Sequence, residues 1–272
     1  MFVCPENIRS ITMGNELTNE EVNQFIEQGF VKIENAFPSE LAVACREILW
    51  RDTGCDPNDA GSWTHPVIRL GNYSEEPFRQ AANTEKLHIA FDQLVGKDRW
   101  LPRGGLGTFP IRFPNPSDPG DAGWHADAGF YGDDGSMRLN VQSKGRALLM
   151  LFLFSDVGLN DAPTRILSGS HLDVPLLLTP AGDDGLTFLE LAQRLQQKTL
   201  EREVAFATGC AGTVFLCHPF LIHGAQKHQG QSPRFLAQPP LQPASSDSIM
   251  LNRDNGDYSP VEIAIRLGLS ID

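Results

Sequence analysis

Short runs of apolar residues, separated by clusters of Gly and Pro, dominate the chain between residues 104 and 241. The run 147–157 is nearly continuous, which is typical of a strand buried on both faces. Further strands are predicted at 104–113, 164–167, 211–222 and 235–241. Many short strands with turn signals between them predict a mainly β fold with flanking helices. The predicted core is a double-stranded β-helix, the jelly-roll barrel of cupin-like proteins.

Apolar residues at helical spacing lie mainly outside this core. Thr18 and Glu21 have the spacing of a capping box at the start of a first helix, and Gly29 ends it. Residues 1–15 show no pattern and are predicted to be a loose leader. We expect one domain over 1–272, made of an N-terminal helical region packing on the barrel (1–103), the β-helix core (104–241) with a helical insertion (186–200), and a tail with a short helix (242–272).

The candidate chemistry begins with His125 and Asp127, which are two residues apart. On a strand this spacing puts both side chains on one face. An imidazole beside a carboxylate supplies two ligands of a metal site, and His223, in the apolar stretch 213–225, is the best third ligand. Two histidines and one carboxylate leave one side of the metal open. This is the facial arrangement of non-heme Fe(II) oxygenases.

Positive residues near these ligands predict a site for an organic diacid. Arg234 follows His223 by eleven residues, after a turn-like segment at 227–233. A guanidinium beside an open iron can grip a carboxylate through two hydrogen bonds, and 2-oxoglutarate has such a group at the end away from the metal. Arg112 and Thr108 precede the metal motif and share one strand face. Arg112 either helps to hold 2-oxoglutarate or forms a salt bridge with an acidic residue.

Other histidines compete for these roles. His218 lies five residues before His223, an odd offset that points it to the opposite face of a strand. Eleven residues beyond His218 stands Gln229, which cannot clamp a carboxylate. His228 sits in the turn and is predicted to be solvated. His171 follows a Gly-Ser turn, where a structural hydrogen-bonding role is favoured over a role as a ligand.

The ordered set of His125-Ala126-Asp127, His223 and Arg234 resembles the phytanoyl-CoA dioxygenase family of Fe(II)/2-oxoglutarate oxygenases. The segment 161–171, which ends in Gly-Ser-His, is also similar, and the resemblance runs from about residue 105 to residue 241. It implies that His125, Asp127 and His223 bind Fe(II). It also implies that 2-oxoglutarate chelates the iron and reaches Arg234, and that O2 takes the open position.

The implied reaction is hydroxylation of an unactivated C–H bond, with decarboxylation of 2-oxoglutarate to succinate and CO2. Related halogenases carry a small residue in place of the carboxylate, so Asp127 favours a hydroxylase. One position departs from the pattern. Several relatives have a hydroxyl two residues after the distal histidine, where this chain has Ala225. Thr108 or Arg112 would have to supply the missing donor.

The composition of the chain limits the classes of partner that it can bind. The net charge of −12 argues against nucleic acid and anionic membranes, which need a basic face. The sequence has no stretch of about 20 apolar residues, so no membrane span is predicted. The start of the chain lacks the pattern of a signal peptide, and the five cysteines are scattered, so we expect reduced thiols in a cytoplasmic protein. The expected partner is a small-molecule metabolite, and the oligomeric state is open.

Two other functions use the same three ligands. A cupin-like protein could bind a metal or ligand without turnover, although it would not need Arg234 beside an open metal face. A zinc-dependent hydrolase is the second alternative, and the sequence offers it no evident general base.

Overall fold

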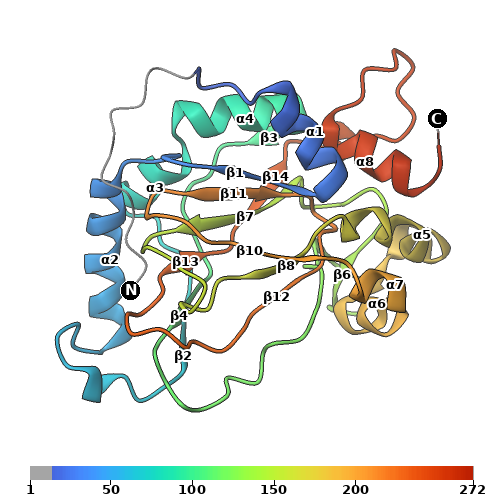
Figure 1. Cartoon of the computed structure of the whole chain (residues 1–272). Coiled ribbons are helices and arrows are strands. Elements are labelled where there is room, and N and C mark those ends of the chain that lie inside the picture. Colours follow the sequence, from blue (N-terminus) through green and yellow to red (C-terminus); the bar gives the residue numbers. More distant parts are fainter. Residues whose placement is uncertain (1–13, 272) are drawn as a thin grey trace.

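A six-stranded antiparallel sheet is the largest β element of the computed structural model, which describes residues 14–271 (Figure 1). Its strands follow the order β1-β11-β7-β14-β3, and β13 also pairs with β7. The bounds are β1 Phe30–Ile33, β3 Trp100–Leu101, β7 Leu148–Leu153, β11 Val214–Cys217, β13 Leu236–Ala237 and β14 Pro240–Pro243. Most of the predicted leader lies outside the described residues, and so does Cys4.

Three smaller sheets complete the β structure. The first has the order β10-β8-β12, the second pairs β2 with β4, and the third has the order β5-β6-β9. The bounds are β2 Val67–Leu70, β4 Phe109–Arg112, β5 Phe130–Tyr131, β6 Met137–Leu139, β8 Arg165–Leu167, β9 Leu186–Thr187, β10 Val204–Phe206 and β12 His223–Gly224. Each predicted strand region contains an observed strand, but the observed strands are shorter.

Helices flank the sheets, as the apolar spacing predicts. Figure 1 shows α1, α4 and α8 on the same side of the large sheet. The bounds are α1 Asn19–Gln28, α2 Ser39–Thr53, α3 Glu76–Ala82, α4 Glu85–Val95, α5 Val174–Leu178, α6 Phe188–Arg194, α7 Gln197–Leu200 and α8 Pro260–Gly268. The capping box of α1 is present. The predicted helical insertion at 186–200 is instead β9 followed by two short helices, because Leu195 leaves the helical conformation. Among the described helices, none has the length and apolar character needed to cross a membrane.

Strand β7 is buried on both faces, which confirms the prediction for its apolar run. Leu148, Met150 and Phe152 belong to one apolar cluster, whereas Leu149, Leu151 and Leu153 belong to a second. The second cluster also contains Ile166 of β8. The large sheet and the β10-β8-β12 sheet therefore share one core, and this core fixes the position of β12, which carries His223.

The cysteines differ in part from the expectation. Cys45, Cys55 and Cys217 are free thiols, and burial raises the pKa of Cys45 to about 12. Cys210 is disulfide-bonded, so the prediction of a reduced thiol is wrong at this position.

Two buried histidines fasten α1 and α8 to the turn after β8. The Nε2 atom of His171 lies 2.9 Å from the carbonyl oxygen of Ile26, and its ring is 4.8 Å from that of His218. The Nε2 atom of His218 lies 3.3 Å from the carbonyl oxygen of Val261 in α8. A Cβ atom at Gly29 would come within 2.5 Å of His171 Nδ1, so only glycine fits there. The structural role predicted for His171 is confirmed.

We predict that the protein loses stability as the pH falls from about 6.5 towards 4. Burial lowers the pKa of His171 to about 4, so the folded state holds the neutral ring while the unfolded chain takes up a proton near pH 6.5. His171 alone should cost about 1 kcal/mol of unfolding free energy between pH 7.5 and 5.5. Urea unfolding at the two pH values measures this loss. In His171→Gln the loss should be smaller, and an unchanged loss would contradict the assignment.

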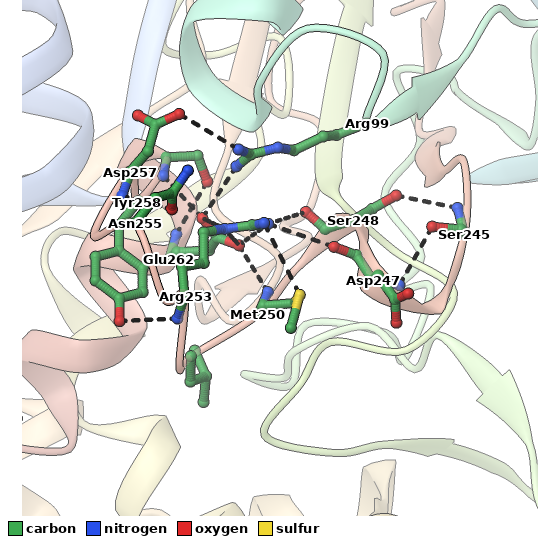
Figure 2. Close-up of polar contacts among 12 residues, drawn as sticks. Arg99, Ser245, Asp247, Ser248, Met250, Arg253, Asn255, Asp257, Tyr258 and Glu262 are labelled. Carbon is green, nitrogen blue, oxygen red and sulfur yellow. Dashed lines mark hydrogen bonds and ion pairs between the residues drawn. The ribbon is translucent and has the colours of Figure 1, made fainter.

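Glu262 anchors the C-terminal segment from inside the protein (Figure 2). Its carboxylate is fully buried and accepts hydrogen bonds from the guanidinium of Arg253, at 2.8 Å, and from the backbone N–H of Met250, at 2.6 Å. Arg99 donates to the same carboxylate at 3.3 Å, which ties the segment to the residues just before β3. One buried acid thus holds residues 250–262 against the core.

Glu262→Gln should lower the unfolding free energy by about 3 kcal/mol, because it leaves two arginines next to a neutral side chain in a buried place. Denaturant unfolding measures the change. Asp257→Asn is the matched control, since Asp257 is 78% exposed and lies 3.6 Å from the same Arg99. It should change stability by less than about 0.5 kcal/mol. Equal effects of the two substitutions would show that burial of Glu262 does not matter.

Candidate metal centre

Backbone pairing brings the two predicted histidine ligands together. His125 and His223 form an isolated antiparallel bridge, with N–H···O distances of 2.9 Å and 2.8 Å between their backbones. The centroids of their rings are 4.4 Å apart. Residue 125 follows the segment after β4, whereas residue 223 begins β12, so the bridge joins two distant parts of the chain.

Three ligand atoms converge at this bridge. Asp127 Oδ1 lies 3.7 Å from His125 Nε2 and 3.8 Å from His223 Nε2. The Nδ1 atoms of the two rings lie 3.0 Å from the carbonyl oxygens of Gly123 and Leu221. If each Nδ1 carries the proton that these carbonyls accept, the lone pair on each Nε2 faces Asp127. Such carbonyls orient metal-binding histidines in many sites, and the donor set suits a divalent metal. The convergence predicted from the sequence is confirmed as geometry.

Charge and burial keep the ligand atoms in their metal-binding forms. Burial raises the pKa of Asp127, but electrostatic interactions with Arg146, His223 and His125 lower it by a larger amount. The pKa of Asp127 therefore lies below its usual value. Burial lowers the pKa of His223 to about 4, against the opposing effect of Asp127. At neutral pH the site therefore offers a carboxylate and a neutral imidazole.

Arg146 completes the site and was missed by the sequence reasoning. Its Nη1 atom lies 3.4 Å from Asp127 Oδ2, and its Nη2 atom donates to the carbonyl oxygen of Ala128 at 3.0 Å. One oxygen of Asp127 thus faces the imidazoles and the other faces a guanidinium. A signal was present, because Arg146 directly precedes the apolar run 147–157 and a charge at the start of a buried strand needs a partner.

The candidate ligands line two cavities. The smaller, of about 220 Å³, is in contact with both histidines, and the larger, of about 470 Å³, is in contact with Asp127 and Arg146. Thr108 and Gln238 line both cavities. Thr108 therefore lies next to the candidate ligands. The smaller cavity is also lined by Arg69, Pro110, Arg112, Asp121 and Ala225.

Arg112 and Arg234 lie side by side behind the ligands. They form an antiparallel bridge with backbone N–H···O distances of 3.1 Å and 2.8 Å, which puts both side chains on one face. Arg112 lines the smaller cavity and forms a salt bridge with Asp121 at 2.6 Å, so both roles considered for it are compatible. Arg234 is buried and donates to the carbonyl oxygens of Ala162 and Pro110. Burial and then Arg112 lower its pKa well below the usual value.

The rival histidines do not belong to the group of candidate metal ligands. His218 packs against His171 and Phe25. His228 is buried, with 6% exposure, so the prediction of a solvated residue is wrong. Its Nδ1 accepts a hydrogen bond from the backbone of Gly230, which holds the ring inside the turn, and burial lowers its pKa to about 4.

Comparison with solved structures shows a shared fold. HygX from Streptomyces hygroscopicus, solved with nickel, 2-oxoglutarate and hygromycin B, is 19% identical, with a TM-score of 0.52 over 82% of this chain and 86% of that one. EctD from S. alaskensis, in its apo form, is 18% identical, with a TM-score of 0.51 over 85% and 79% of the two chains.

SnoK, a non-heme α-ketoglutarate-dependent carbocyclase from nogalamycin biosynthesis, is 18% identical, with a TM-score of 0.52 over 82% of each chain. No curated protein sequence matches the chain. Residues 25–236 match the family described as phytanoyl-CoA dioxygenase (PhyH), which covers well over half of the sequence. The chain belongs to the phytanoyl-CoA dioxygenase family.

Proposed function

We propose that the protein is an Fe(II)- and 2-oxoglutarate-dependent dioxygenase that hydroxylates an unactivated C–H bond of a small-molecule metabolite. The observation that carries the proposal is the convergence of His125 Nε2, His223 Nε2 and Asp127 Oδ1 beside a cavity with Arg112 on its wall. We further propose that the sheets form a double-stranded β-helix core over residues 104–241, within one domain.

We assign roles to the three candidate ligands and to three residues near them. His125, Asp127 and His223 would hold the iron. Arg112 and Arg234, whose side chains share one face, would supply positive charge for the distal carboxylate of 2-oxoglutarate. Thr108 would donate the hydrogen bond that Ala225 cannot. Bound iron would supply the activation of O2, coupled to conversion of 2-oxoglutarate into succinate and CO2.

The protein's own contribution is geometry. Arg146 would hold Asp127 Oδ2, so that Oδ1, which faces the two imidazoles, would be available to bind the metal. The buried position of His223 would exclude water from one side of the site. The larger cavity, which contacts Asp127 and Arg146 and is not lined by Arg69 or Arg112, would admit the substrate.

The relatives support this class of reaction. HygX was solved with iron in one structure and with nickel, 2-oxoglutarate and hygromycin B in another. SnoK is described as a carbocyclase and SnoN as an epimerase, so oxidations other than hydroxylation use this fold. Hydroxylation is favoured here as the simplest outcome at a site with a carboxylate ligand, and the substrate decides between these outcomes.

Metal binding should stabilise the protein through Asp127. With Mn(II), as a redox-stable substitute for Fe(II), at 100 times its dissociation constant, the unfolding free energy should rise by about 2.7 kcal/mol. Asp127→Ala should lose this gain, because it removes the only carboxylate among the three candidate ligands. Thermal unfolding with and without Mn(II) measures the effect. Asp254→Asn, an exposed acid in the C-terminal segment, should keep the gain. Equal stabilisation of wild type and Asp127→Ala would place the metal elsewhere.

Turnover of 2-oxoglutarate tests the proposed function itself. Protein loaded anaerobically with Fe(II) and 2-oxoglutarate should develop a visible charge-transfer absorption, and admission of air should give slow succinate formation even without substrate. Asp127→Ala should show neither signal. Metal binding without any 2-oxoglutarate consumption would favour the cupin-like binding protein. Metal-dependent hydrolysis that needs no O2 would favour the zinc hydrolase.

A further inference from the structure

A carboxylate of the chain itself lines the cavity that we assign to 2-oxoglutarate. Asp121 lies in the irregular segment between β4 and His125 and lines the smaller cavity together with both histidine ligands. Its Oδ2 atom accepts hydrogen bonds from Arg112 Nη2 at 2.6 Å and from Arg69 Nη2 at 2.5 Å. The group that neutralises the cationic wall of this cavity is therefore chemically the same as the distal end of the co-substrate.

The hydrogen bonds around this carboxylate are incomplete. Asp121 Oδ1, Arg112 Nε and Arg234 Nε are all buried and have no hydrogen-bond partner among residues 14–271. Two guanidiniums, from Arg69 and Arg112, bind this single carboxylate, and a third, from Arg234, belongs to the residue paired with Arg112. Buried polar atoms without partners are costly, and an excess of positive charge beside a cavity favours a second anion. The positive charge of the cluster can therefore balance one more carboxylate. Arg112, however, already binds Asp121.

We propose that Asp121 is an internal competitor that sets the affinity of this site for 2-oxoglutarate. The inference rests on the proposed function. On binding, the co-substrate takes Arg112, and Asp121 keeps only Arg69, whose side chain is 57% exposed. The carboxylate of Asp121 then releases the inner guanidinium, of Arg112, and stays on the outer one, of Arg69. Binding of the co-substrate includes the cost of this exchange, which weakens it and makes it selective for ligands whose carboxylate reaches Arg112.

The exchange requires rotation of one side chain, since the backbone around it is held elsewhere. Lys227 donates to the carbonyl oxygen of Pro116, and Arg165 donates to that of Ala122. The guanidinium of Arg165 also stacks over the ring of Trp124, 4.3 Å from its centroid. Substitution of Asp121 should therefore leave the segment in place.

The test is the dissociation constant of 2-oxoglutarate for the Fe(II)-loaded protein under anaerobic conditions, from the charge-transfer absorption or from calorimetry. Asp121→Asn keeps the shape of the side chain but removes its charge, and it should bind 2-oxoglutarate about tenfold more tightly than wild type. Asp118→Asn, an exposed acid of the same segment, should leave the constant unchanged. Unchanged or weaker binding by Asp121→Asn overturns the proposal, because Asp121 would then be neutral or would orient Arg112 for the ligand.

Substitution of Arg69 distinguishes competition by Asp121 from direct contact between Arg69 and the co-substrate. Arg69→Gln should weaken binding in the wild-type background, because Asp121 then stays on Arg112, and it should have little effect in the Asp121→Asn background. Equal weakening in both backgrounds would mean that Arg69 itself binds the co-substrate, and the exchange would be wrong. If neither wild type nor Asp121→Asn binds 2-oxoglutarate, the proposed function fails together with this inference. If wild type binds and Asp121→Asn binds no better, only the inference fails.

Discussion

The antiparallel bridge between His125 and His223 is the constraint on which the site depends. Two backbone hydrogen bonds hold the ligand-bearing segments in register, and a slip of one residue would turn each side chain to the opposite face. The core fixes the register of this bridge, because β12 pairs with β8 and Ile166 of β8 is buried next to β7. The apolar run of β7 therefore positions the candidate metal ligands although it contributes none of them.

Positive charge is concentrated at this site in a chain whose net charge is −12. Arg69 and Arg112 line the smaller cavity, Arg234 lies behind it, and Arg146 lies on the other side of Asp127. Low-dielectric walls strengthen the attraction between such groups and an anionic ligand. A local excess of arginine would thus let an acidic protein select a dianionic co-substrate, and in our proposal Asp121 limits how strongly it does so.

The sequence was sufficient where the signal was local or chemically distinctive. The buried strand at β7, the capping box of α1 and the convergence of His125, Asp127 and His223 are all observed. Contacts set by distant pairing were not predictable in this way. Asp121 reaches Arg69 through the packing of a loop on β2, in a region without a strong strand pattern. The burial of His228 likewise depends on how its turn folds back, whereas its composition suggested an exposed loop.

The central claim is that three distant side chains bind one metal ion beside a carboxylate-binding cavity. A crystal structure with Ni(II) and 2-oxoglutarate tests it most directly. The account predicts one ion bound by His125 Nε2, His223 Nε2 and a single oxygen of Asp127, with the distal carboxylate of 2-oxoglutarate on Arg112 and with Asp121 turned towards Arg69. An ion bound elsewhere, or 2-oxoglutarate bound away from the arginines, would contradict it.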